Sequence, residues 1–134
     1  MKVFSQSLEF STKGEIDFID LTERVRTLVS ESQVNGGIAH VFTPHATGVV
    51  VVTEDDWNLL EDIKRALERL IPKQAAYRHP SNAHAHLRSI LLSPDRTLPI
   101  VDGKLALGTW QSIFFIETDV RPRQRTVTVQ ILGE

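Results

Sequence analysis

Histidines are concentrated in one short segment of this chain. His79, His84 and His86 fall within eight residues, and the whole chain has only five histidines. Asn82 is suited to cap a helix that begins there, and the positive end of that helix disfavours imidazolium, so the rings stay in the neutral form that metal ligands and general bases require. Positions i and i+2 of a helix point about 200° apart, so His84 and His86 are not expected to share one site. We therefore select His86, His79 and Asn82 as site candidates; the alternative is a solvated helix start with incidental histidines.

A fourth histidine lies where a buried strand is expected to end. The segment Pro44-His45-Ala46-Thr47 follows an apolar strand and precedes four consecutive valines. Loops that leave strands often carry functional groups, and His45 is suited to act as a base, a phosphate partner or a metal ligand. Thr47 is a candidate for substrate binding. The alternative is a surface loop with a turn proline.

Two carboxylates lie near the end of a segment expected to be a long strand, residues 110–119. Without a bulge, Gln111, Glu117 and Asp119 lie on one face of that strand. Carboxylates two residues apart on one face suit Mg²⁺ binding or general acid–base chemistry. Gln111 and Trp110 are candidates for substrate binding, although Trp110 also suits a packing role. The alternative is that both acids are simply solvated.

Three arginines follow this segment at alternate positions. Arg121, Arg123 and Arg125 lie on one side of an extended chain, and guanidinium groups suit phosphate and carboxylate recognition. We therefore include all three as candidates for contact with an anionic metabolite. The competing interpretation is a solvated edge strand that is protected by its charges.

The elements that must position these side chains follow from hydrophobic periodicity and from turn residues. One helix is expected after Asp20 and ends near Gln33. A second follows Thr53, whose side chain is expected to cap it, and stops at Pro72; a third, shorter helix follows Asn82. Asp102-Gly103 predicts a two-residue hairpin. Strands are expected at 2–11, 38–42, 49–52, 98–101, 105–107, 110–119 and 126–132. The fold class is therefore α+β, a mostly antiparallel, sandwich-like sheet of six or seven strands with two or three helices.

Size and composition limit the possible classes of protein. The chain has 134 residues, which predicts one domain over residues 1–134. It has no cysteine, which excludes disulfides and thiolate metal sites, and its net charge of -2 gives no general attraction to nucleic acid or anionic membrane. The sequence shows no signal peptide and no apolar stretch of membrane-spanning length, so a cytoplasmic location is expected.

Several of these segments together resemble the YjbQ-like family of small bacterial and archaeal proteins. The resemblance covers nearly the whole chain. Its most specific part is the stretch Leu107-Gly108-Thr109-Trp110-Gln111. The other matching segments are 41–47 with Glu54 downstream, 82–87, 98–100, 103–106, 115–119 and the arginine-rich segment.

This resemblance implies a fold, an assembly and an activity. It implies an α+β sandwich that assembles as a homotrimer, with a pocket near the subunit boundary lined by the matching His, Glu and Arg residues. Members of the family are often described as secondary thiamine-phosphate synthases, which join a pyrimidinylmethyl group from its diphosphate to thiazole phosphate.

Three functions remain open from the sequence. The first is a transferase of this kind, with His45, His86, Glu117 and Arg123 as catalytic residues. In that transferase, Mg²⁺ on Glu117 or Asp119 is a candidate cofactor. The second is a metal-dependent hydrolase of a phosphorylated or carboxylated metabolite, in which His45, His79 and His86 hold a Zn²⁺-class ion, with Glu54 as a further candidate ligand and Glu54 or Glu117 as the base. The third is a non-catalytic trimeric protein that binds an anionic metabolite.

Overall fold

The computed structural model describes all 134 residues, which form three helices and eight strands. In chain order these are β1 (Lys2–Ser11), β2 (Asp17–Asp20), α1 (Thr22–Ser32), β3 (Gly37–Phe42), β4 (Gly48–Thr53), α2 (Trp57–Leu70), α3 (Ala83–Leu92), β5 (Asp95–Val101), β6 (Lys104–Leu105), β7 (Ser112–Glu117) and β8 (Gln124–Gly133). The strands form two sheets, and every pair of neighbouring strands is antiparallel. The predicted α+β class with a mostly antiparallel sheet is confirmed.

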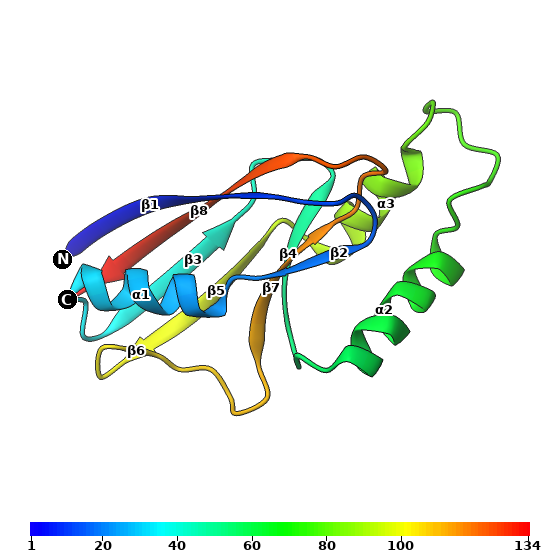
Figure 1. The fold of residues 1–134 in the computed structure, drawn as a ribbon. Helices are drawn as coiled ribbons and strands as arrows, with labels where there is room; N and C mark the ends of the chain where they lie inside the picture. Colours follow the sequence, from blue (N-terminus) through cyan, green and yellow to red (C-terminus); the bar gives the residue numbers. More distant parts are fainter.

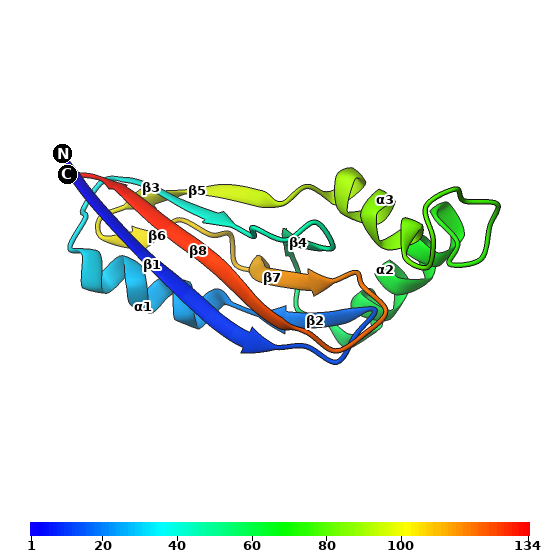
Figure 2. The same ribbon diagram turned by 90° about the horizontal axis from the view of Figure 1, so that it is seen from above.

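The larger sheet has the order β1-β8-β3-β5-β6, and the smaller has the order β2-β7-β4. β1 and β8 run side by side along the length of the molecule, and the two chain termini lie together at one end (Figures 1 and 2). α2 and α3 lie at the opposite end (Figure 1). The two sheets and α1 enclose the main hydrophobic core.

The smaller sheet is covered on both faces, which explains the run of valines in β4. Val50 and Val52 face the main core, together with Ile113 and Phe115 of β7. Val49 packs instead with Ile116 of β7 and Leu67 of α2 in a second cluster. Successive side chains of a strand point to opposite faces, so a strand covered on both faces needs an apolar residue at every position.

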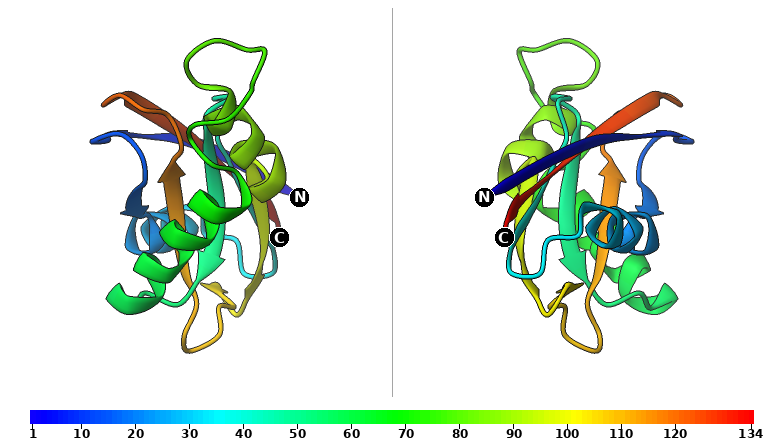
Figure 3. Two further views of the ribbon diagram at one scale, coloured as in Figure 1. Left: turned by 90° about the vertical axis from the view of Figure 1, so that its right-hand side faces the viewer. Right: turned by 90° about the vertical axis from the view of Figure 1, so that its left-hand side faces the viewer.

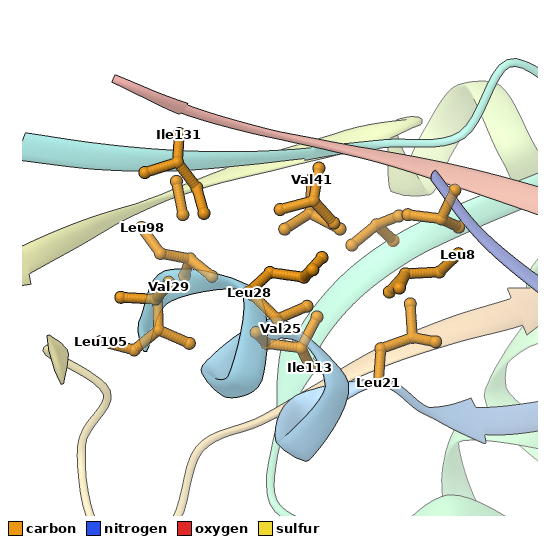
Figure 4. Close-up of a cluster of buried hydrophobic side chains, with 14 of the residues drawn as sticks. Leu8, Leu21, Val25, Leu28, Val29, Val41, Leu98, Leu105, Ile113 and Ile131 are labelled. Carbon is orange, nitrogen blue, oxygen red and sulfur yellow. The ribbon is translucent and has the colours of Figure 1, made fainter. Parts of the chain in front are cut away.

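One side of the main core is the larger sheet, and the opposite side is formed by one face of α1 together with the smaller sheet. Figure 4 shows Val25, Leu28 and Val29 of α1 pointing toward Val41 and Ile131 of the sheet. α1 begins after Asp20, as predicted, although Leu21 rather than Asp20 occupies the N-cap position. Asp20 Oδ1 accepts hydrogen bonds from the backbone N–H and the hydroxyl of Thr22, at 2.9 and 2.6 Å. These bonds satisfy a free backbone donor at the start of the helix.

The start of α2 differs from the prediction. Thr53 does not cap this helix, because it still belongs to β4, where it pairs with Ser112 of β7. Asp56 caps the helix instead, and its carboxylate accepts a hydrogen bond from the N–H of Leu59 at 2.9 Å. Seen from the end of the molecule, α2 and α3 lie over β4 and β7 (Figure 3).

The strands also differ from the prediction in their extent and number. The expected strand over 110–119 is only Ser112–Glu117, because its partner β4 offers pairing over Gly48–Thr53 alone. β2 was not expected, and with it the strands number eight rather than six or seven. The hairpin at Asp102-Gly103 is confirmed, and both residues have the positive φ angles, 52° and 75°, that a tight two-residue turn requires.

None of the three helices combines the length and the apolar character that crossing a bilayer demands.

Candidate functional site

A cavity of about 620 Å³ lies between the β3–β4 loop and α3. Its volume is within the range of small-molecule sites. The lining residues are Phe42, Thr43, Pro44, His45, Ala46, Gly48, His86, Ser89, Ile90 and Pro94. Two segments selected from the sequence, the loop at His45 and the helix start at His86, therefore meet at one cavity.

His45 is held in one orientation by a backbone hydrogen bond. The backbone pairing of β3 with β8 ends at Phe42, opposite Thr128. Beyond that point the imidazole of His45, rather than the backbone of β3, hydrogen-bonds to β8. Its Nε2 accepts a hydrogen bond from the N–H of Thr126 at 3.0 Å. This bond places the remaining proton on Nδ1, which makes no hydrogen bond within the protein. A neutral His45 is therefore a hydrogen-bond donor at the wall of the cavity.

The environment of His45 favours the neutral ring. Burial lowers the pKa of His45 from its ordinary value, and the nearby charge of Arg125 lowers it further, while Glu117 opposes the shift. Protonation at Nε2 would also break the hydrogen bond from Thr126, since both nitrogens would then be donors. His45 consequently stays uncharged at neutral pH.

His86, Ser89 and Thr43 supply the other polar atoms of the cavity. His86 and Ser89 lie one turn apart on the same face of α3. The Ser89 hydroxyl donates to Ala85 O at 2.8 Å and contacts Thr118 Oγ1 at 2.8 Å. Thr43 is 1% exposed, and its hydroxyl has no hydrogen-bond partner. A buried hydroxyl without a partner is costly, and a bound molecule gains a hydrogen bond from this one only where the cavity wall moves aside to expose it.

Behind the β3–β4 loop lies a buried ion pair between the two sheets. Glu117 is the last residue of β7 and Arg125 the second residue of β8. Both side chains point inward, and they are 0% and 7% exposed. Arg125 Nε donates to Glu117 Oε1 at 2.7 Å, and Arg125 Nη2 donates to the other carboxylate oxygen. Thr12 Oγ1 and the N–H of Asp119 complete the shell of the carboxylate, at 2.6 and 3.0 Å. Arg125 also donates to the carbonyl and hydroxyl oxygens of Thr47, at 3.0 and 2.9 Å.

A second ion pair joins the same loop to the start of α3. Asp119 accepts hydrogen bonds from Arg123 Nη2 at 2.9 Å, from the Thr47 hydroxyl at 3.0 Å and from the Asn82 amide at 3.4 Å. Burial raises the pKa of Asp119, but hydrogen bonds from Val120 N–H, Thr47 and Asn82 outweigh burial, so that the pKa lies below its ordinary value. Asn82 occupies the N-cap position of α3, although its side chain is used for this contact rather than for capping.

Glu117, Asp119, Arg123 and Arg125 therefore form a supporting layer. None of them lines the cavity. Thr47 links the two ion pairs to each other and lies between His45 and Gly48, which do line it. In this chain the four charged groups position the loop that holds His45.

Other residues selected from the sequence lie elsewhere. Gln111 precedes β7 and Glu117 ends it, a separation of about 20 Å along an extended strand. Trp110 is exposed, and the Gln111 side chain accepts a hydrogen bond from the N–H of Gly108 at 2.8 Å. Glu54 follows the end of β4 remote from Thr47 and is exposed. Arg121 is exposed in the turn before β8.

The side chains of this chain do not assemble the predicted metal ligands. The structure contains no group of three or more His, Asp or Glu residues placed to hold an ion. The rings of His79 and His86 are in edge contact, with centroids 5.0 Å apart, and His79 Nε2 lies 3.0 Å from Asn82 Oδ1. His79 and His86 thus form a pair without a third ligand.

His84 turns away from this site, as its position two residues before His86 predicts. It is fully buried, and its Nε2 lies 2.8 Å from Glu15, which also binds Lys73 at 2.7 Å. The buried Arg88 reaches Glu15 at 3.5 Å and donates to the carbonyl of Ile71. Burial raises the pKa of Glu15, but its bonds to Lys73 and His84 outweigh this and lower it overall. These contacts tie α2, α3 and the β1–β2 turn together.

Sequence reasoning missed Thr12, Thr43 and Ser89. Isolated hydroxyl residues give no periodic or clustered signal, and only the pairing of strands and the packing of α3 bring them to the site. Thr43 lies within the 41–47 segment, but nothing in its residue type marks it as unpaired. A threonine directly after a buried strand and next to a functional histidine is the one available indication.

Comparisons with known proteins identify the family and the fold of this chain. The model of the family described as UPF0047 protein YjbQ-like matches residues 6–134. A UPF0047 protein of Methanothermobacter thermautotrophicus is 39% identical over 137 residues, which span 100% of this chain and 95% of that protein. A YbjQ-like protein of unknown function from Sulfolobus solfataricus has the same fold, with a TM-score of 0.96, 35% identity and 99% of both chains covered. A YjbQ/UPF0047 protein from Clostridium acetobutylicum gives a TM-score of 0.90 at 38% identity, over 95% of this chain and 99% of that one.

Proposed function

The chain belongs to the UPF0047 YjbQ-like family, and from that premise we propose that it is a small-molecule enzyme that acts in the cavity beside His45. The reaction we propose is the group transfer that the family resemblance implies. A pyrimidinylmethyl carbon loses its bond to a diphosphate oxygen, which leaves with the electron pair as pyrophosphate. The nitrogen of a thiazole phosphate then supplies the pair for the new carbon–nitrogen bond.

The observation that supports this proposal is the fixed, neutral His45 in a cavity with few charges. Its Nδ1–H has no partner in the protein and is oriented by the bond from Thr126 to Nε2. A donor fixed before the substrate binds does not have to reorganise when charge develops in the reaction. Phe42, Ile90 and Pro94 form apolar walls, which would shield a reactive carbon from water once a neighbouring subunit closes the cavity.

The supporting layer explains why the loop can hold its shape. Arg125 binds both the carbonyl and the hydroxyl of Thr47, so the residues on either side of Thr47 are fixed from behind. Gly48 allows the close approach of Phe115, whose ring lies where a Cβ atom would be. We therefore assign Glu117 and Arg125 to positioning rather than to contact with the substrate.

The test is binding and turnover measured on the same variants. The protein is purified without a histidine tag and screened by thermal shift against phosphate, pyrophosphate and thiamine precursors, followed by an assay of product formation on each hit. We expect His45→Gln and His86→Ala to abolish turnover with melting temperatures within a few degrees of wild type. Gln6→Ala, on the exposed face of β1, is the control. Equal turnover in wild type and His45→Gln would refute the proposal.

A non-catalytic binding protein is the second candidate, and one observation favours it. The carboxylates of Glu117 and Asp119 are both engaged by arginines, so neither is available for proton transfer in this chain. This alternative predicts saturable binding without any product. The hydrolase interpretation needs a metal, and measuring the metal content of the untagged protein tests it: a stoichiometric transition metal would revive it.

We also propose that the protein assembles as a homotrimer. Leu87, Ile90 and Leu91 of α3 are 42%, 79% and 57% exposed, and Ile90 forms part of the cavity wall. A neighbouring subunit that covers these residues would bury apolar surface and close the cavity. Light scattering coupled to gel filtration tests this: a mass near 15.1 kDa, that of one chain, would contradict it.

A further inference from the structure

Two cavities lie in succession along one face of α3. The first is the cavity beside His45; the second has a volume of about 320 Å³. The second is lined by Tyr77, Arg78, His79, Ala83, His86 and Leu87. His86 belongs to both. Along α3, residues 83, 86 and 87 face the second cavity, and residues 86, 89 and 90 face the first. This is the i, i+3, i+4 spacing of one helical stripe, so the two cavities are about one turn, or roughly 5 Å, apart.

The first cavity has no counter-charge for an anion. Neither lysine nor arginine lines it, and its two imidazoles include the neutral His45. The guanidinium groups of the supporting layer, those of Arg123 and Arg125, are already bound to carboxylates, and Arg96, beside Pro94, donates to the backbone oxygens of Leu92 and Asp95. An anion placed there would find no cationic side chain to pair with, so we expect the phosphate groups of the proposed substrates to lie beyond this cavity. The unpartnered Thr43 hydroxyl and the Nδ1–H of His45 instead suit an uncharged group with hydrogen-bonding atoms.

The second cavity offers the charge that the first one lacks. Arg78 lines it and is exposed. It takes part in none of the ion pairs of the chain. Its guanidinium is therefore free to bind a carboxylate or phosphate. His79 lies beside it and contacts the ring of His86 at the junction of the two cavities.

We propose that the two cavities form one bipartite site, in which Arg78 binds the anionic group of a molecule whose uncharged part occupies the cavity of Thr43 and His45. The substrate class is thus an uncharged organic group joined to a phosphate or carboxylate by a linkage of about one helical turn. This inference rests on the proposed function and adds a specificity residue to it, Arg78.

The experiment uses three simple probes that separate the two halves of the site and a fourth, benzyl acetate, as a neutral control. Benzyl phosphate contains a ring and an anion, benzyl alcohol only the uncharged part, and inorganic phosphate only the anion. Binding of each to the full-length protein is followed by changes in the amide NMR spectrum. We expect benzyl phosphate to bind at least about tenfold more tightly than benzyl alcohol, since a charge-assisted contact is added. Benzyl acetate, which is neutral and of similar length, should bind no more tightly than benzyl alcohol.

Variants assign each half to its residues. Arg78→Gln should weaken benzyl phosphate about tenfold and leave benzyl alcohol unchanged, while Arg78→Lys should retain part of the affinity. Thr43→Val should weaken both benzyl phosphate and benzyl alcohol. Arg69→Gln, which removes another exposed arginine from the end of α2, is the matched control and should change neither.

The outcomes distinguish this inference from the function on which it rests. If benzyl alcohol binds and depends on Thr43, but Arg78→Gln binds benzyl phosphate as wild type does, the bipartite site is refuted and the small-molecule cavity stands. If no probe perturbs the amides of either cavity, both proposals fail. Melting temperatures of all variants within a few degrees of wild type show that the comparison is made on folded protein.

Discussion

Replacing Arg125 by methionine measures how much stability the protein loses when the buried carboxylate of Glu117 is left without its arginine partner. Methionine keeps most of the side-chain volume but leaves Glu117, which is 0% exposed, without both of its guanidinium bonds. Only Thr12 and the N–H of Asp119 then remain as donors to the carboxylate. Removing one partner of a buried pair typically costs about 3–5 kcal/mol, and we expect a loss in that range.

This free energy corresponds to a large shift in melting temperature. The unfolding entropy of about 2.1 cal/mol/K per residue gives about 0.28 kcal/mol/K for a chain of 134 residues. A loss of about 3–5 kcal/mol therefore lowers Tm by roughly 11–18 °C. Urea unfolding at pH 7 and one fixed protein concentration measures the free energy directly, provided that the m-value stays constant.

A double variant shows whether the uncompensated charge of Glu117 causes this loss. In the double variant Glu117→Gln/Arg125→Met the uncompensated charge is gone, so we expect it to recover about 2 kcal/mol relative to Arg125→Met alone. Lys64→Met breaks a half-buried pair with Glu61, one turn apart on α2, and serves as the control, with a loss below about 1 kcal/mol. If Arg125→Met and Glu117→Gln each cost under about 1 kcal/mol alone and their effects add in the double variant, the reasoning about buried charge is wrong.

Three further predictions concern the cavity and its supports. Because burial and Arg125 lower the pKa of His45, NMR titration should place that pKa below the ordinary value of 6.5, and a value at or above 6.5 would contradict this. As pH falls below 6.5 the unfolded chain then binds more protons than the folded one, so the free energy of unfolding should decrease. Gly48→Ala forces a Cβ atom into the ring of Phe115, so it should lower the free energy of unfolding by about 1–3 kcal/mol and abolish probe binding. An unchanged urea midpoint would show instead that the loop can move aside. Thr43→Val removes a hydroxyl without a partner and should leave stability unchanged or raise it slightly, so that a loss above about 1 kcal/mol would reveal an unrecognised partner.

Much of the fold could be predicted because its signals are local. Four valines in succession predicted a strand covered on both faces, and α2 and the main core do cover β4. Asp102-Gly103 predicted the hairpin from the backbone angles that such residues tolerate. The start of α2 was missed because Thr53 and Asp56 are both good caps. Pairing with β7 decided between them, and that pairing is a contact between residues far apart in the sequence.

The sequence by itself determined which residue types were available at the site. It also predicted correctly that His84 and His86 point to different sides of α3, because helical geometry alone sets the directions of two side chains on one helix. Only the tertiary structure decided which groups face a ligand. Glu117 and Arg125 look equally suited to catalysis and to structure in a sequence, but the facing of β7 and β8 buries them against each other. The opposite holds for Arg78, which no pattern marked and which the packing of the 73–82 loop beside α3 leaves unpaired in a cavity. Whether a charge is neutralised depends on its neighbours in space, and residue type and spacing do not contain that information.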